Sequence, residues 1–221
     1  FQNIQGNKEA KIQKARQQLQ EIDSKIHLEI ADTEKEKFKL IGNEILPLVD
    51  SIGLDETEAL KIAEVSDKDY SEPLKMGEAF DLMKNLMEET ALERCHLHTY
   101  RYHLLVAEKG YGLDLEVLRD GMIFGELSAI KCAEKGRIPN LEDFKGLDFE
   151  DIHVKNLDEL EDFADFFNLD EFVETGKALI EDYKVCAIPT LIHEDPKRLV
   201  GMGDLISSGA FAYELSKENG Q

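Results

Sequence analysis

The sequence lacks tryptophan, has only three cysteines and five prolines, and is poor in cationic residues. Its 26 Lys and Arg residues stand against 47 Asp and Glu residues, so the formal net charge is −21. A nucleic-acid-binding protein needs a basic patch that displaces counterions from phosphate backbones, and this sequence contains none. No apolar run approaches the ~18 residues of a membrane span, and no signal-peptide pattern opens the chain. We therefore expect neither a nucleic acid nor a membrane as a partner.

The three cysteines, Cys95, Cys132 and Cys186, lie far apart in the sequence and form no CxxC pair. Cys95 and Cys186 lie within apolar runs, where buried, reduced thiols are the usual state. This is typical of a cytoplasmic protein. The chain has 221 residues and begins with Phe1 rather than Met. Its opening helix has no strand before it, so we expect the chain to be part of a longer protein.

Strand and helix patterns alternate along the chain. Strand patterns occur at 26–31, 49–52, 95–100, 102–107 and 183–188. Helical periodicity, capping residues and a stop at Gly136 predict helices at 7–22, 33–48, 55–65, 71–90, 115–133 and 205–216. We expect one or two helices in the acidic segment 137–182, and within it a mobile excursion at 156–169. We expect a polar loop at 190–199. The alternation predicts a single α/β domain with a largely parallel sheet.

A glycine-rich turn before the last helix is the most informative segment, LVGMGDLISSGAF at Leu199–Phe211. Gly201 and Gly203 let the backbone approach a ligand closely. The following helix points its unpaired N–H groups and the positive end of its dipole at the turn, where negative charge is stabilised. Asp204 could there take a proton from a hydroxyl while the amides hold a phosphoryl group. Alternatively, Asp204 is a simple N-cap and the glycines form a loop.

Three further segments accompany this turn, and their order carries a family resemblance. They are IHLEIA at Ile26–Ala31, ILPLVDSIGLDETE at Ile45–Glu58 and HLHTYRYHL at His96–Leu104. With Ile188–Phe211, they resemble in order the HxE strand, the NxxE region, the His-Thr strand pair and the nucleotide loop with anion hole of one family. That family is the ADP-dependent glucokinases and phosphofructokinases of archaea and animals, which are ribokinase-like kinases.

The resemblance implies a three-layer αβα, ribokinase-like fold, with residues 1–221 as the carboxy-terminal part of the large nucleotide-binding and catalytic domain. The amino-terminal half, with the lid and most sugar contacts, is absent from this chain and would be its partner. The implied glycolytic reaction transfers the β-phosphate of ADP to a hydroxyl of glucose or fructose 6-phosphate and gives AMP. Asp204 would be the base, and the backbone amides of Gly201, Met202 and Gly203 would stabilise the moving phosphoryl group.

Two glutamates are the candidates for a metal site. His27 and Glu29 are two residues apart on a strand and face the same way, and Mg²⁺ prefers few carboxylates together with water and phosphate oxygens. The resemblance implies that Glu29 and Glu58 place Mg²⁺ or another divalent cation. Alternatively, Glu58 only forms a capping box with Asp55, and His27 is a structural histidine.

The resemblance places the adenine of ADP or AMP beside the loop from Ile188 to Val200, near the carboxyl end of a strand, where α/β sheets bind ligands. Its candidates are Ile188, Val200, His98 and Thr99. Without the resemblance, these four residues would be ordinary core residues.

Three positions depart from the family pattern: Asp55 stands where Asn is usual, and Leu199 and Leu205 stand where Thr is usual. The change to leucine at Leu199 speaks against a side-chain contact from this position to the nucleotide. The change at Leu205 leaves the backbone amide of the anion hole in place. Two other functions stay open at this point. One is a non-catalytic ADP- or AMP-binding module, and the other is a ribokinase-like kinase that uses ATP.

Overall fold

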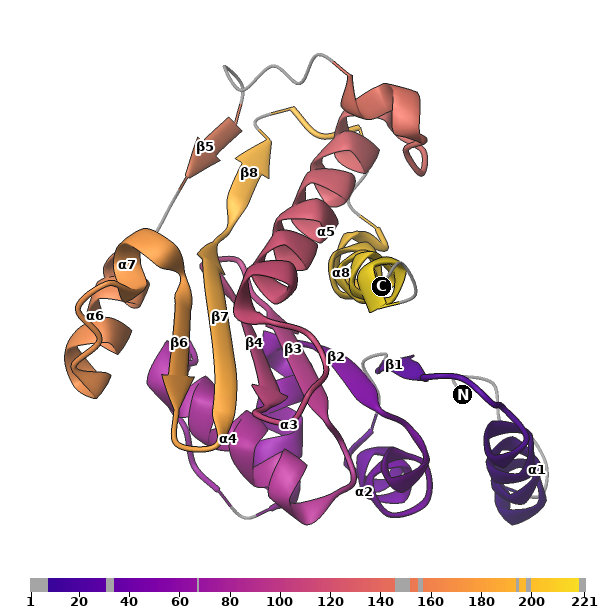
Figure 1. Cartoon of the computed structure of the whole chain (residues 1–221). Coiled ribbons are helices and arrows are strands. Elements are labelled where there is room, and N and C mark those ends of the chain that lie inside the picture. The colour runs from indigo at the N-terminus through magenta and orange to yellow at the C-terminus, as the bar shows by residue number, and fades with distance from the viewer. Residues whose placement is uncertain are drawn as a thin grey trace.

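The computed structural model describes residues 8–30, 34–66, 68–145, 152–154, 157–193, 195–197 and 200–218. A six-stranded sheet with the order β1-β2-β3-β4-β7-β6 forms its centre (Figure 1). Its strands are β1 His27–Glu29, β2 Ser51–Asp55, β3 Arg94–His98, β4 Tyr102–Glu108, β6 Lys177–Ile180 and β7 Tyr183–Pro189. β5 Ile152–Val154 and β8 Leu191–His193 pair as a separate two-stranded sheet.

Four of the six strands run in one direction. β1, β2 and β3 pair in parallel, whereas β4 is antiparallel to β3 and β7, and β6 is antiparallel to β7. The links at 99–101 and 181–182 are too short for a crossover, which takes a dozen or more residues. β4 and β6 therefore have to reverse direction. The predicted mostly parallel α/β sheet is confirmed, with β4 and β6 as the two reversed strands.

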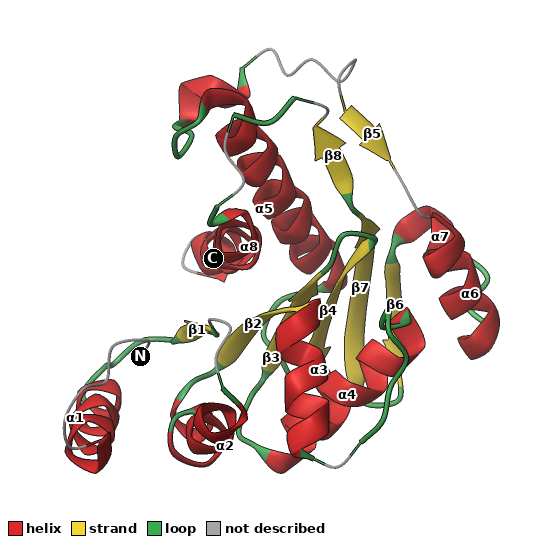
Figure 2. Ribbon diagram, turned by 180° about the vertical axis from the view of Figure 1, so that it is seen from behind, coloured by secondary structure: helices red, strands yellow, loops and turns green. Residues whose placement is uncertain are grey.

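Helices cover both faces of this sheet. The α-helices are α1 Lys8–Gln20, α2 Lys35–Glu44, α3 Glu56–Val65, α4 Met76–Glu89, α5 Leu115–Lys135, α6 Leu157–Phe167, α7 Phe172–Thr175 and α8 Met202–Glu218. Two 3₁₀ turns, η1 Leu46–Leu48 and η2 Leu141–Phe144, accompany them. α5 and α8 pack on one face, and α3 and α4 pack on the other (Figure 2). The expected three-layer αβα arrangement is thus present. Within the described residues, no helix is long and apolar enough to cross a membrane.

Local chemistry sets the helix ends that the sequence predicts. Asp55 Oδ1 accepts the Glu58 N–H, and Glu58 Oε2 accepts the Asp55 N–H, both at 2.8 Å. This is the predicted capping box, and it starts α3 directly after β2. Gly136 ends α5 in the left-handed conformation with φ of 71°, which a glycine adopts without steric cost. Thr33, the predicted cap of α2, lies outside the described residues, and α2 begins after Glu34.

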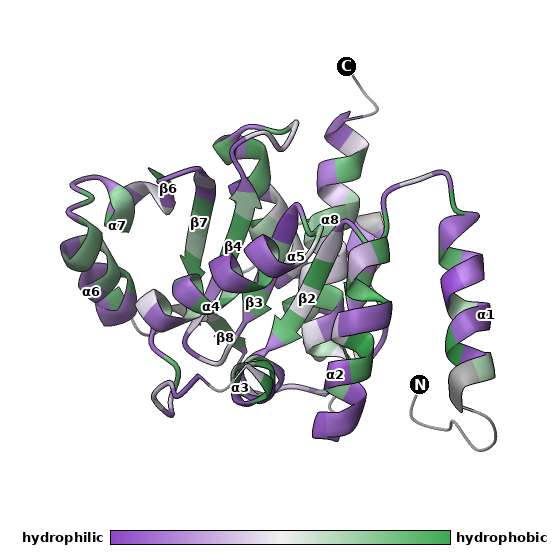
Figure 3. Cartoon of the chain, turned by 90° about the horizontal axis from the view of Figure 1, so that it is seen from below, coloured by the Kyte–Doolittle hydropathy of each residue, from purple (hydrophilic) through white to green (hydrophobic). Residues whose placement is uncertain are grey.

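The main hydrophobic core lies on the α3 and α4 side of the sheet. Strand side chains on this side are fully buried, and they meet Phe80 and Met83 of α4. The strand residues are Ile52, Leu54, Leu97, Leu104 and Val106. In Figure 3 the central strands carry hydrophobic segments, and the helices mix hydrophobic and hydrophilic residues. The predicted cysteines Cys95, Cys132 and Cys186 are all buried and free.

Several predicted boundaries were wrong. The mobile excursion expected at 156–169 is instead α6, and its Leu160 and Phe163 are each only 2% exposed. The loop predicted at 190–199 contains β8, and β6 was not predicted. The helix expected from Ser71 begins only at Met76. The last helix begins at Met202 rather than at Leu205, so Asp204 lies inside its first turn.

The opposite face of the sheet is polar where α8 covers it. α8 turns Ser207, Phe211 and Glu214 inward, at a spacing of four and three residues that keeps them on one helical face. Glu214 accepts hydrogen bonds from Arg94 Nε at 2.9 Å and Nη2 at 2.7 Å, and both side chains are completely buried. Tyr111 donates to the same carboxylate at 3.2 Å. This ion pair anchors the C-terminal half of α8 to β3.

Glu214→Ala is expected to destabilise the protein by about 3–5 kcal/mol, because it leaves the Arg94 guanidinium buried without its counter-charge. The control is Glu218→Ala on the same helix. Its carboxylate pairs with Lys25 at 3.2 Å near the surface, where an ion pair contributes at most about 1 kcal/mol. Urea unfolding of both variants measures the difference. Equal midpoints for the two variants would contradict the anchoring role.

Candidate functional site

The predicted site residues come together at the carboxyl ends of the parallel strands. Glu29 ends β1, Asp55 ends β2 and His98 ends β3. The strand register pairs Asp55 with His98 and Glu29 with Gly53, so all three lie at or near the carboxyl ends of neighbouring strands. The first turn of α8 lies against the same end of the sheet, because Gly203 packs on the His98 ring. Open α/β sheets bind ligands just outside the carboxyl ends of their strands.

The turn that leads into α8 has the geometry of an anion site. Gly201 has φ of 77°, a conformation that favours glycine. The first hydrogen bond of the helix runs from Leu205 N–H to Gly201 O at 3.3 Å. No described hydrogen bond uses the backbone N–H groups of Gly201, Met202 or Gly203. Asp204 lies exposed in this first turn, where the helix dipole stabilises negative charge.

His98 lies directly beneath this turn. A Cβ atom on Gly203 would come within 2.2 Å of His98 Nε2, so only glycine fits there. Burial lowers the pKa of His98 to about 4, and the nearby charge of His103 acts in the same direction. Its Nδ1 is buried without a hydrogen-bond partner among the described residues. The turn therefore rests on a neutral imidazole and not on a cation.

Glu29 is held by one donor from its own strand and one from α8. His27 Nε2 lies 2.6 Å from Glu29 Oε1, and Ser207 of α8 donates to the same oxygen. The carboxylate lies over Gly53 of β2, where a Cβ atom would come within 2.4 Å of Oε2. Both described hydrogen bonds of the side chain end on Oε1, so Oε2 is the oxygen that a cation would use.

Glu58 lies near three other carboxylates. Its side chain is 5% exposed, and burial raises its pKa to about 8. The hydrogen bond from the Asp55 backbone opposes this rise, whereas the negative charges of Asp55, Glu29 and Asp204 add to it. Within the described residues, no three acidic, His or Cys side chains form a complete metal cage. Two carboxylates suit Mg²⁺, because this ion keeps water and phosphate oxygens as its other ligands.

The four predicted nucleotide residues have different surroundings. Ile188 is 8% exposed and belongs to a small hydrophobic cluster with Leu105 of β4 and Leu118 and Met122 of α5. The Thr99 hydroxyl lies 2.8 Å from the Tyr102 carbonyl and closes the hairpin between β3 and β4. His98 faces the α8 turn, and Val200 is 81% exposed beside that turn. Their role in nucleotide binding stays a prediction. Leu199 lies outside the described residues.

Sequence analysis missed the polar layer under α8. Arg94, Ser51, Ser207 and Glu214 are all buried and hydrogen-bonded there. Two patterns could have revealed it. Arg94, His96 and His98 occupy alternate positions of a strand that is otherwise apolar. Ser207 and Glu214 are separated by two helical turns, so they lie on the same face of one helix. Both patterns place polar side chains where a core is expected.

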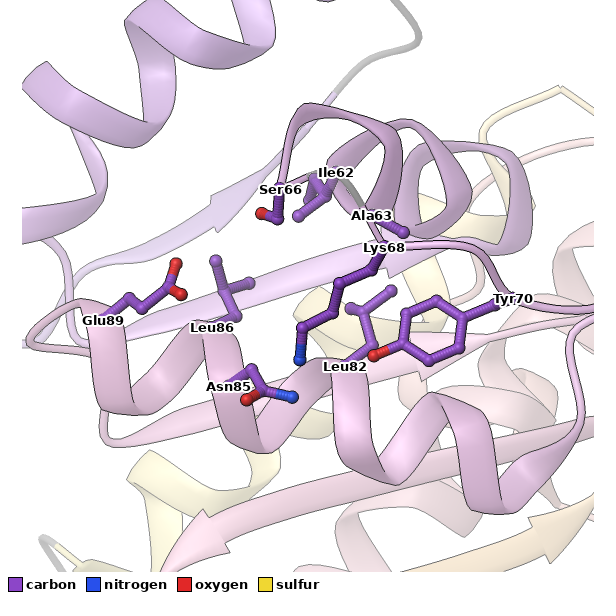
Figure 4. Close-up of a pocket in the computed structure, with 9 residues that line it drawn as sticks. All are labelled: Ile62, Ala63, Ser66, Lys68, Tyr70, Leu82, Asn85, Leu86 and Glu89. Carbon is purple, nitrogen blue, oxygen red and sulfur yellow. The ribbon is translucent and has the colours of Figure 1, made fainter.

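A small cavity lies elsewhere, between the end of α3 and the middle of α4 (Figure 4). Its volume of about 20 Å³ suits a single water molecule rather than a nucleotide. Lys68 and Tyr70 point into it, and both contact Asp81, with the tyrosine hydroxyl donating at 2.6 Å. It lies on the opposite face of the sheet from α8 and plays no part in the site.

The fold and the site define an α/β protein of the class that binds ligands at the carboxyl ends of its strands. A family model, the ADP-specific phosphofructokinase/glucokinase conserved region, matches residues 1–213. The chain therefore belongs to the ADP-specific phosphofructokinase and glucokinase family.

Individual relatives agree with this family. The ADP-dependent glucose/glucosamine kinase of Pyrococcus abyssi is 37% identical over 210 residues, which cover 90% of this chain and 43% of that protein. The ADP-specific phosphofructokinase of Methanosarcina acetivorans is 31% identical and is matched over 42% of its length. A solved ADP-dependent kinase in complex with fructose-6-phosphate and ADPβS superposes with a TM-score of 0.84 at 26% identity, over 97% of this chain and 51% of that one. The chain spans about half the length of the relatives it matches.

Gly53→Ala is expected to destabilise the protein by about 1–3 kcal/mol, because the added methyl group has to displace the Glu29 carboxylate and the Ser207 hydroxyl. The control is Gly42→Ala in α2, where a methyl group meets nothing within 4 Å. That change removes a flexible helix residue and is expected to stabilise by roughly 0.4–1 kcal/mol. Thermal unfolding compares the two. A neutral Gly53→Ala variant would contradict the close packing of Glu29.

Buried histidines make stability depend on pH. Burial holds the pKa of His96 well below its ordinary 6.5, with the Arg94 charge acting in the same direction, and both its ring nitrogens lack described hydrogen-bond partners. Below pH 6.5 the unfolded chain binds a proton that the native histidine does not, so stability falls as the pH drops. For His98, with a pKa of about 4, this loss extends from about 6.5 to about 4.

His96→Leu is therefore expected to make the loss of stability on acidification shallower, by up to about 1.4 kcal/mol per pH unit. Chemical unfolding at pH 7.0, 6.0 and 5.0 measures the slope for the wild type and the variant. Parallel slopes would show that His96 is not a neutral buried group.

Proposed function

We propose that this chain is the carboxy-terminal part of the large domain of an ADP-dependent sugar kinase, and that it carries the base and the anion hole. The observation that carries the proposal is the first turn of α8. There, the exposed Asp204 carboxylate and the backbone amides of Gly201, Met202 and Gly203, which no hydrogen bond between described residues uses, lie at the same end of the sheet as Glu29 and Glu58. The family supports ADP as the phosphoryl donor.

The proposed reaction follows from these groups. Asp204 takes the proton of a sugar hydroxyl, whose oxygen attacks the β-phosphorus of ADP. The bond from that phosphorus to the bridging oxygen breaks, and its electron pair leaves with AMP. The amides of Gly201, Met202 and Gly203 stabilise the negative charge of the moving phosphoryl group. The neutral His98 beneath Gly203 keeps the turn in place.

The metal and the nucleotide have proposed places beside these groups. Glu29 and Glu58 would hold Mg²⁺ or another divalent cation, which, when bound, neutralises charge on the phosphate oxygens. The adenine would lie near Val200, whose exposed side chain offers an apolar surface beside the turn. Ile188, His98 and Thr99 form the adjacent strand ends.

The acceptor is proposed to be glucose or fructose 6-phosphate. Relatives of both kinds match the chain: a glucose/glucosamine kinase and several phosphofructokinases. The chain is strongly acidic, and a sugar phosphate needs cations in its pocket. We place those cations, with the lid, in an amino-terminal half that would complete the site, and the reaction in the cytoplasm as a step of glycolysis.

Asp204→Asn in the full-length protein is expected to lower kcat by about 10²–10⁴-fold, because the amide cannot accept the hydroxyl proton. The Kd for ADP should change little, since Asp204 meets the sugar hydroxyl and not the nucleotide. Steady-state assays with glucose and with fructose 6-phosphate, beside calorimetric titration with ADP, measure both quantities.

The control is Glu218→Gln at the other end of α8, which should keep full turnover. Wild-type turnover in Asp204→Asn would remove the base assignment. ADP binding by the wild type without turnover on either sugar would favour a non-catalytic binding module, and faster turnover with ATP than with ADP would favour an ATP-using kinase.

A further inference from the structure

A chain of hydrogen bonds runs from the buried ion pair under α8 to Glu29. Arg94 uses Nε and Nη2 for Glu214, and its remaining Nη1 donates to Ser51 Oγ at 3.0 Å. Ser51 Oγ lies 2.8 Å from His27 Nδ1, and His27 Nε2 lies 2.6 Å from Glu29 Oε1. Three strands, β3, β2 and β1, each contribute one step.

The donors and acceptors of this chain can take only one direction. Arginine has no acceptor, so Ser51 accepts from Arg94 and keeps its own hydrogen for His27 Nδ1. A carboxylate has no hydrogen, so His27 Nε2 carries the N–H that Glu29 accepts. A neutral imidazole has one N–H. The Ser51 hydroxyl at one nitrogen and the Glu29 carboxylate at the other both assign that N–H to Nε2.

α8 adds two contacts to this series of hydrogen bonds, one to Glu29 and one to the His27 ring. Ser207 donates to Glu29 Oε1, the oxygen that already accepts from His27. Phe211 stacks on the His27 ring at 5.0 Å between centroids and 23° between planes, and the Arg94 guanidinium lies 5.5 Å from the same Phe211 ring. The imidazole is thus held in its plane by one helix face while its two nitrogens are held by the strands.

We propose that Arg94, Ser51 and His27 form a directional relay of positioning residues. The relay fixes His27 as the Nε2–H tautomer and, with Ser207, holds Glu29 by Oε1 so that Oε2 stays available to a divalent cation. This inference rests on the proposed cation role of Glu29. The outer partners of a metal ligand affect affinity because they set its orientation and charge.

The test begins with the metal-free, full-length protein. Long-range ¹H–¹⁵N NMR of the histidine rings, with His27 assigned from a His27→Gln variant, reports the tautomer directly. The expected result is Nε2–H in the wild type and a mixture of tautomers in Ser51→Ala. The matched control is Ser128→Ala, because Ser128 is also buried and donates only within α5, to Phe124 O at 2.7 Å. An Nδ1–H tautomer in the wild type overturns the relay.

The second measurement is Mn²⁺ titration followed by electron paramagnetic resonance, without nucleotide. Ser51→Ala is expected to weaken Mn²⁺ binding about tenfold or more, and Ser128→Ala is expected to leave it unchanged. If Glu29→Gln weakens binding and Ser51→Ala does not, the relay is wrong while the cation site stands. If Glu29→Gln has no effect, or the wild type binds no Mn²⁺, the cation role fails and this inference fails with it.

Arg94 is tested with its partner, because removal of Arg94 alone leaves Glu214 buried and charged. The double variant Arg94→Met with Glu214→Leu replaces a buried ion pair by apolar groups, a change that proteins often tolerate. It removes the donor that makes Ser51 accept, so His27 should again show mixed tautomers in a folded protein. A pure Nε2–H tautomer in this variant would show that Arg94 does not direct the relay.

Discussion

The ion pair between Arg94 and Glu214 is completely buried, and the placement of α8 depends on it. A buried pair of this kind contributes little net stability, because the desolvation of two charges offsets much of their attraction. What it supplies is geometry. The guanidinium meets the carboxylate through two of its nitrogens, and this allows one rotation and one height of α8 above the sheet. The first turn of the same helix carries Asp204, so the position of that residue follows from an interaction ten residues away.

The two faces of the sheet have different roles: one supplies hydrophobic stabilisation, and the other holds polar side chains in fixed orientations. On the α3 and α4 face, fully buried aliphatic and aromatic side chains supply the hydrophobic stabilisation of the domain. On the α8 face, β1, β2 and β3 present His27, Ser51, Arg94 and His98 to the helix. Burying a polar group costs free energy, and only hydrogen bonds to that group offset this cost. The second face therefore trades stability for a set of side chains whose orientations are fixed.

The sequence predicted the elements with strong local patterns and missed those that depend on partners far away in the chain. The capping box of Asp55 and Glu58 and the stop at Gly136 are local, and both are present. β6 is short and its Leu179 is exposed, so its pattern is weak without β7 beside it. Residues 156–169 were predicted to be a mobile excursion within an acidic segment, yet Phe163 of α6 packs against Phe80, 83 residues earlier. No local pattern contains that contact.

The site shows the same limit in chemical terms. Glu29, Glu58 and Asp204 were predicted as site residues from the family resemblance, together with the place of Glu29 in a strand and of Asp204 after a glycine-rich turn. Ser51 and Arg94 have many uses, and only the pairing of three strands shows that they lie in line with His27. Gly53 gives the clearest case: a strand glycine looks like a weak point, but the missing side chain is the space that the Glu29 carboxylate fills. In this domain the requirement for the small residue comes from a neighbouring strand, so it can be understood only once the sheet register is known.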